Sequence, residues 1–142
     1  MEGKLSRTGP VYYRRNQAGT WLPGQPATIP FARGSGGMVS TAWDYAIFCQ
    51  MMLNEGSYNG ARILDPETVA LLTSPKIEIA EGRAYGYGWQ ITEGVMRHGG
   101  SDGTDAWIDP ENGIIGLVFT QTPRGRPSVE RFRALVELAV ED

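Results

Sequence analysis

The chain has 142 residues, of which 41% are hydrophobic and 20% charged, as expected of one soluble globular domain. A net charge of −3 excludes the strongly basic surface that nucleic-acid binding requires. No apolar run is long enough to cross a membrane, and the first residues lack the apolar core of a signal peptide. One cysteine and one histidine exclude an internal disulfide and a zinc set, so we expect no metal and no cofactor.

Residues 1–36 are rich in proline, glycine and arginine, and we expect them to wrap loosely over a core formed elsewhere. A short β-like run at 11–15 and another at 20–22 predict a small hairpin. Residues 37–142 then carry the regular elements. We therefore expect one partial domain over 1–142, with no internal repeat.

Two helices are predicted next, over residues 41–55 and 65–74. Thr41 is a suitable N-cap with Asp44 three residues later, and apolar residues recur after it at helical spacing. Cys49 falls on this apolar stripe, which favours a buried core residue over a reactive thiol. In the second helix Asp65 is the expected cap, Pro66 the first helical residue, and the helix ends before residue 75.

Residues 85–91 alternate large apolar side chains with glycine and glutamine, which predicts one strand. Its bare glycine face admits either a ligand or a tightly packed helix. A hairpin is predicted from strands at 104–108 and 114–120, with Asn112-Gly113 at the turn. Its second strand is apolar on both faces, which indicates a central position in the sheet.

The last predicted element is an amphipathic helix that lies on the sheet. Its apolar positions are Val129, Phe132, Leu135, Val136 and Ala139. Together the elements predict an α+β fold in which about three antiparallel strands are flanked by helices.

A short motif, His98-Gly99-Gly100-Ser101, precedes the predicted hairpin. Three further stretches accompany it: Gly-Ser-Gly-Gly at 34–37 leading into a helix, Tyr-Gly-Trp at 87–89, and the turn at 107–111. In this order they resemble the C-terminal part of serine β-lactamase-like proteins, which include class C β-lactamases, penicillin-binding proteins and esterases. The resemblance covers roughly residues 10–140 and implies the C-terminal portion of the β-lactamase/transpeptidase-like fold.

The resemblance also implies roles for the motif, which is the third active-site motif of that family. His98 is then a polar side chain offered to the substrate, and Gly99 and Gly100 let the acyl group lie against the backbone. The N–H of Ser101 is then one of the two donors of the oxyanion hole. These four residues are candidates for the oxyanion hole and substrate wall, toward a small acyl or peptide-like ligand.

The nucleophile that this chemistry needs is missing from the sequence. In the family an acyl-enzyme forms on the serine of Ser-x-x-Lys, helped by a lysine or a tyrosine of a second motif. Here Met1 and Thr73 stand three positions before Lys4 and Lys76, and no Tyr-x-Asn or Tyr-x-Ser occurs. We therefore assign no catalytic residue to this chain and expect the N-terminal catalytic-serine portion to be absent and the chain to be inactive alone.

A competing interpretation makes Ser101 itself the nucleophile. Residues 99–103 match Gly-x-Ser-x-Gly, the nucleophile elbow of α/β-hydrolases. That elbow requires a following helix and a later histidine, whereas 104–108 predicts a strand and His98 is the only histidine. A purely structural interpretation is also available, in which a carboxylate such as Asp102 holds His98 at the sheet edge.

An incomplete sheet has consequences for partners. We expect an open strand edge and an uncovered apolar face, covered by homo-oligomerisation or by a separate N-terminal portion. Three functions stay open: part of a hydrolase acting on esters, β-lactams or peptides, a non-catalytic binding or scaffolding module, and a truncated protein that still folds.

Overall fold

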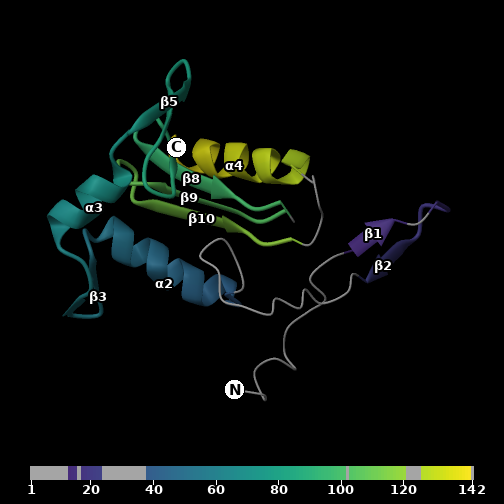
Figure 1. Cartoon of the computed structure of the whole chain (residues 1–142), viewed down its shortest axis with the longest axis horizontal. Helices are drawn as coiled ribbons and strands as arrows, with labels where there is room; N and C mark the ends of the chain where they lie inside the picture. The colour runs from purple at the N-terminus through teal and green to yellow at the C-terminus, as the bar shows by residue number, and fades with distance from the viewer. Residues whose placement is uncertain (1–12, 16, 24–37, 102, 121–125, 142) are drawn as a thin grey trace.

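The computed structural model describes residues 13–15, 17–23, 38–101, 103–120 and 126–141. Its centre is a six-stranded antiparallel sheet in the order β10-β9-β8-β7-β6-β5 (Figure 1). The strands are β5 (Ile77–Ala80), β6 (Arg83–Tyr85), β7 (Gln90–Thr92), β8 (Val95–Gly99), β9 (Asp105–Asp109) and β10 (Ile114–Val118). Each strand pairs with the one before it in sequence, so the sheet is a simple meander, and the predicted α+β class is confirmed.

The prediction of one strand over 85–91 is wrong, because the chain turns back within it. The N–H of Gly86 donates to the carbonyl of Trp89 at 2.8 Å, and Gly88 has a φ of +89°, which glycine adopts at little cost. A Cβ at position 86 would lie 2.9 Å from the carbonyl oxygen of Leu72, so helix backbone occupies that side. The glycines therefore mark a tight connection between two strands. Strands β5 and β8 were not predicted either, so the sheet has more than the three or so strands expected.

Both predicted helices before the sheet are confirmed. Helix α2 (Ala42–Leu53) begins at Thr41, whose Oγ1 accepts a hydrogen bond from the N–H of Asp44 at 3.1 Å. Helix α3 (Pro66–Thr73) begins with a proline, as predicted, although Asp65 makes no side-chain capping bond. Cys49 is fully buried in α2, as its place on the apolar stripe predicted.

The strand β9 separates two layers of packing, because consecutive side chains of a strand point to opposite faces. Ile108 is fully buried among α2, α3 and the sheet, in a cluster with Cys49, Met52 and Met96. On the other face Trp107 meets Phe132 of helix α4 (Arg126–Glu141), with ring centroids 5.9 Å apart. Figure 1 shows α2 and α4 on opposite sides of the sheet, so the predicted C-terminal helix does lie on it.

The strand β10 is an edge strand among the described strands, so its predicted central position is wrong. It pairs with β9 in register over its whole length, from Ile114 opposite Asp109 to Val118 opposite Asp105. All five of its residues are apolar or glycine. The same composition fits a strand that is central only when another segment pairs with its free edge.

Apolar side chains also stay exposed beside this sheet. Leu135 and Leu138 of α4 are 65% and 60% exposed, and Trp43 near the start of α2 is 74% exposed. The open edge and uncovered apolar surface that the sequence predicted are both present in the described part of the chain.

Two small hairpins lie outside the main sheet. The predicted one pairs β1 (Tyr13–Arg15) with β2 (Trp21–Pro23), and the rest of the expected wrap over 1–36 lies mostly outside the described residues. A second, unpredicted one pairs β3 (Ser57–Tyr58) with β4 (Ala61–Arg62). Its turn is Asn59-Gly60, and both residues have positive φ, the conformation of a type I′ turn.

Candidate functional site

The motif predicted from the sequence lies at the end of β8, in the middle of the sheet. Strand β8 is hydrogen-bonded to β7 on one side and β9 on the other, so the backbone that leads into the motif is held firmly. His98 and Gly99 are the last strand residues, and Gly100 and Ser101 begin the connection to β9. All four residues are exposed, so a ligand can reach them.

The ring of His98 is held by a tyrosine that the sequence analysis did not identify. The hydroxyl of Tyr85 lies 2.6 Å from Nε2 of His98, and the two rings meet edge to face with centroids 6.0 Å apart. Tyr85 ends β6, and β7 lies between β6 and β8, so the phenol reaches across one strand. Asp102, the predicted carboxylate partner of His98, lies outside the described residues.

Gly99 is constrained by an ion pair between the two central strands. Arg97 binds Asp105 through two hydrogen bonds of 2.8 Å, from Nε and from an Nη, and Asp105 is only 7% exposed. The hydrogen bonds that Arg97 donates to Asp105 raise the pKa of Arg97. A Cβ added at Gly99 would lie 3.1 Å from Oδ2 of Asp105, so the buried carboxylate favours glycine at this position.

Gly100 and Ser101 differ in how their backbone N–H groups are used. The N–H of Gly100 donates to the carbonyl of Thr104 at 2.8 Å, which closes the connection to β9. A Cβ at position 100 would collide with Oγ1 of Thr104, so a larger residue here would force the Thr104 side chain to shift. Among the described residues the N–H of Ser101 donates to no acceptor. The N–H of Ser101, an exposed residue, is therefore an unused donor next to the bonded N–H of Gly100.

The interpretation of Ser101 as an elbow nucleophile is wrong. The connection after Ser101 leads directly into strand β9, where the elbow requires a helix. His98 bonds to Tyr85, and no described contact joins it to the hydroxyl of Ser101. The serine therefore has no base within the described part of the chain.

Thr73 and Lys76, a hydroxyl and a lysine three positions apart, are also unsuited to nucleophilic catalysis. Oγ1 of Thr73 donates to the carbonyl of Val69 within its own helix, at 2.9 Å. Nζ of Lys76 lies 5.7 Å from the ring centroid of Tyr87 instead of beside that hydroxyl. Thr73 and Lys76 therefore differ from Ser-x-x-Lys in sequence and also in the contacts that their side chains make.

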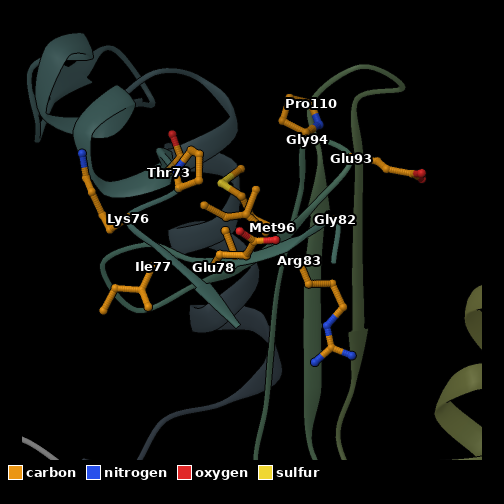
Figure 2. A pocket seen from close by; sticks show the side chains of 13 residues that line it. Thr73, Lys76, Ile77, Glu78, Gly82, Arg83, Glu93, Gly94, Met96 and Pro110 are labelled. Carbon is orange, nitrogen blue, oxygen red and sulfur yellow. The ribbon is translucent and has the colours of Figure 1, made fainter. Parts of the chain in front are cut away.

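A hollow of about 630 Å³ lies away from the motif (Figure 2). It is lined by residues of the α3 end, of the β5–β6 and β7–β8 hairpins and of the β9–β10 turn, and none of the four motif residues contributes to it. Figure 2 shows Glu78 and Met96 near its centre, whereas Glu93 points away. Its lining residues include Thr73 and Lys76, whose hydroxyl and amine make the contacts described above.

The described residues offer neither a metal site nor a membrane-spanning helix. They contain no group of three or more His, Cys, Asp or Glu side chains that could hold a metal ion. None of their helices combines the length and apolarity needed to cross a bilayer. Burial raises the pKa of the Cys49 thiol to about 11, so this cysteine is unsuited to nucleophilic attack at neutral pH.

The comparison with known proteins agrees with the fold. The sequence matches the Beta-lactamase family over residues 4–140, and the chain belongs to this family. It is 30% identical to protein Rv1367c of Mycobacterium tuberculosis over 106 residues, which is 73% of this chain and 23% of that protein. It is 30% identical to a putative D-alanyl-D-alanine carboxypeptidase of Escherichia coli over 104 residues, 63% of this chain and 23% of that protein.

A solved structure gives the same result. A putative 6-aminohexanoate-dimer hydrolase from Bacillus anthracis superposes with a TM-score of 0.58 at 27% identity, covering 70% of this chain and 28% of that one. The chain therefore has a β-lactamase-like serine hydrolase fold, consistent with its C-terminal portion. It spans about a quarter of the length of the curated relatives it matches.

Three residues near the motif were missed by the sequence analysis: Tyr85, Arg97 and Asp105. A weak signal existed for the last two, since opposite charges flank the motif and the turn after it, but the strand that carries Arg97 was not predicted. Tyr85 carried no such signal, because its contact with His98 crosses a strand that the sequence did not predict.

Proposed function

We propose that this chain is the C-terminal part of a β-lactamase-like serine hydrolase, which cleaves an ester, β-lactam or peptide-like amide through a serine-bound acyl intermediate. Two relatives named as a carboxypeptidase and a dimer hydrolase support hydrolysis. The serine and lysine of Ser-x-x-Lys, and the tyrosine of the second motif, would come from an N-terminal portion. This chain alone is then inactive, and its contribution is the third motif.

The observation that carries the proposal is the N–H of Ser101. An oxyanion hole needs a backbone donor that is exposed, fixed in place and not already bonded. Three observations support this role for Ser101: the residue is exposed, its N–H is unused among the described residues, and the preceding N–H of Gly100 is bonded to Thr104. One such donor is worth about 3 kcal/mol of transition-state stabilisation.

His98 supplies the second element of the site. Its exposed ring is oriented by Tyr85 at 2.6 Å, which leaves the other ring nitrogen, Nδ1, without a partner among the described residues. A polar side chain fixed in this way beside the oxyanion donor can hydrogen-bond an oxygen of the bound acyl group. The two glycines between them carry no side chain, so the proposed acyl group could lie against the backbone.

The N-terminal portion also provides a partner for the open edge. Strand β10 has an unpaired edge of apolar residues among the described strands, and Trp43 of α2 and Leu135 of α4 are exposed apolar side chains. We propose that the portion carrying the nucleophile completes the sheet here, and that a second copy of the chain occupies this edge when that portion is missing.

The test begins with the coding sequence upstream of this chain. It is expected to encode Ser-x-x-Lys followed by Tyr-x-Asn or Tyr-x-Ser. The chain expressed with that portion should hydrolyse a chromogenic ester or cephalosporin and be labelled by a fluorophosphonate, whereas the chain alone should do neither.

Two substitutions of Ser101 then test the oxyanion donor in the assembled protein. Ser101→Pro removes the N–H and should lower kcat about 10²-fold or more, whereas Ser101→Ala keeps the N–H and should retain activity. Labelling of the chain alone, abolished by Ser101→Ala, would refute the proposal. Ligand-induced shifts at His98 without turnover by the assembled protein would instead establish a binding module.

A further inference from the structure

The main chain of Tyr85, whose hydroxyl contacts His98, is held by several backbone hydrogen bonds. The backbone of Tyr85 is paired on both sides, with Ile77 of β5 and Gln90 of β7. Its carbonyl also accepts a hydrogen bond of 3.0 Å from the N–H of Lys76. The phenol is therefore anchored by its main chain before it reaches across β7 to the imidazole.

The next residue fixes the same segment against helix α3. A Cβ at Gly86 would lie 2.8 Å from the carbonyl oxygen of Ser74, and the N–H of Tyr87 donates to the carbonyl of Leu72 at 3.2 Å. The chain around Tyr85 thus has little freedom to move its ring. A hydroxyl held in this way can hold its acceptor in turn.

The two ring nitrogens of His98 have different environments. Nε2 lies 2.6 Å from the hydroxyl of Tyr85, whereas Nδ1 has no hydrogen-bond partner among the described residues. A neutral imidazole carries one N–H donor and one acceptor, and the bond made by one nitrogen decides which of them carries the proton. A tyrosine hydroxyl that donates to Nε2 leaves the proton on Nδ1.

We propose that Tyr85 is a positioning residue that holds His98 in the Nδ1–H form, so that the motif offers the acyl group one uncharged donor. This inference rests on the proposed function, because it concerns the substrate side of the same site. An uncharged N–H suits a carbonyl or ether oxygen better than a carboxylate, which favours a cation. The acyl group that contacts His98 therefore belongs to a neutral ester or amide.

Nuclear magnetic resonance of the full chain tests this directly. His98 is the only histidine in the sequence, so long-range ¹⁵N–¹H correlations of its ring give one unambiguous set of signals. At about pH 8, where an ordinary imidazole is neutral, the wild-type chain should show the Nδ1–H pattern. Tyr85→Phe should replace it by the mixture of forms that a solvated ring adopts.

Tyr87→Phe is the matched control, since Tyr87 lies two residues away, is 57% exposed and contacts Lys76 instead of His98. It should leave the ring signals unchanged. An Nε2–H pattern in the wild-type chain would overturn the proposal without any variant, and so would a Tyr85→Phe spectrum that keeps the Nδ1–H pattern.

The measurement needs neither a nucleophile nor turnover, so its result is independent of the proposed hydrolysis. An Nδ1–H ring in a protein whose assembled form shows no hydrolysis would refute the function and leave the Tyr85 contact standing. Active assembled protein with an Nε2–H ring would do the reverse.

Discussion

The two edge strands of the sheet are built differently. Strand β5 is exposed along its whole length, includes the charged residue Glu78, and shifts register against β6 between Glu78 and Ala80. Strand β10 carries no charge, keeps perfect register with β9, and is half-buried or buried throughout. Charges and bulges protect natural sheet edges from further pairing, and only β5 has them.

The difference indicates which edge is suited to exposure to solvent and which is suited to pairing with a further strand. β5 is a finished edge, whereas β10 has the composition of an interior strand without its second neighbour. Changes near β10 should therefore affect stability and association strongly, and matched changes in β5 should have little effect.

The largest difference is expected from removing apolar volume beside each edge. Ile108→Ala, in β9 next to β10, removes a fully buried side chain and should lower the free energy of unfolding by about 2–5 kcal/mol. Ile79→Ala in β5 removes a side chain that is 44% exposed and should cost only about 0.5 kcal/mol. Urea denaturation measures both, and equal losses would contradict the contrast.

The next largest effect comes from adding volume instead. A Cβ at Gly116 of β10 would fall within the ring of Trp107, so Gly116→Ala should cost about 1–3 kcal/mol. Ala80→Val, at an exposed position of β5, should change stability by no more than about 0.5 kcal/mol. A Gly116→Ala chain as stable as the wild type would show that the packing of Trp107 over β10 is loose.

Helix α2, which covers one face of β10, gives the comparison a pH dependence. Burial raises the pKa of the Cys49 thiol from 9.0 to about 11, so the folded chain holds this proton more tightly than the unfolded chain. The resulting stabilisation is complete below about pH 9 and is lost as the pH rises through about 11, a change on the order of 1–3 kcal/mol.

Denaturation between pH 8 and pH 11 should thus show a steeper loss for the wild type than for Cys49→Ala. A cysteine placed on the other edge, Ile79→Cys in the Cys49→Ala background, should react rapidly with an alkylating reagent, whereas Cys49 should react only on unfolding. Rapid alkylation of Cys49 in the folded chain would contradict its burial.

The smallest effect on stability, and the most specific one, concerns association. Ile114→Lys places a charge on the free edge of β10 and should weaken self-association of the isolated chain, measured by light scattering. Ile77→Lys on β5 is the matched control and should leave association unchanged, since this edge is already 68% exposed at that residue. A wild-type chain that stays monomeric would contradict the prediction that the free edge of β10 pairs with a second copy.

Local signals in the sequence predicted the helices and the last hairpin well. The Thr41–Asp44 cap, Pro66 at a helix start and Asn112-Gly113 at a turn act within a few residues, so each is legible without the fold. The error at 85–91 arose because alternation and a glycine-rich connection look alike until the position of Gly88 in a turn is known.

The candidate site was predicted only in part for a similar reason. The residues 98–101 form a contiguous motif, and the structure places them together at the end of β8. The partners that orient them come from elsewhere: Tyr85 from a strand two places away, and Asp105 from across the turn. Such contacts depend on strand order and register, which apolar periodicity does not determine.

The hydroxyl of Thr120 donates to the carbonyl of Gly103 at 2.7 Å, just beyond the end of β10. This bond joins the segment just after the outermost strand to the connection that follows Ser101. Under the proposed function, completion of the sheet and the position of the Ser101 N–H would be coupled through this bond. An N-terminal portion that carries the nucleophilic serine and pairs with β10 would then also stabilise the connection after Ser101, which lies on the substrate side of the proposed site.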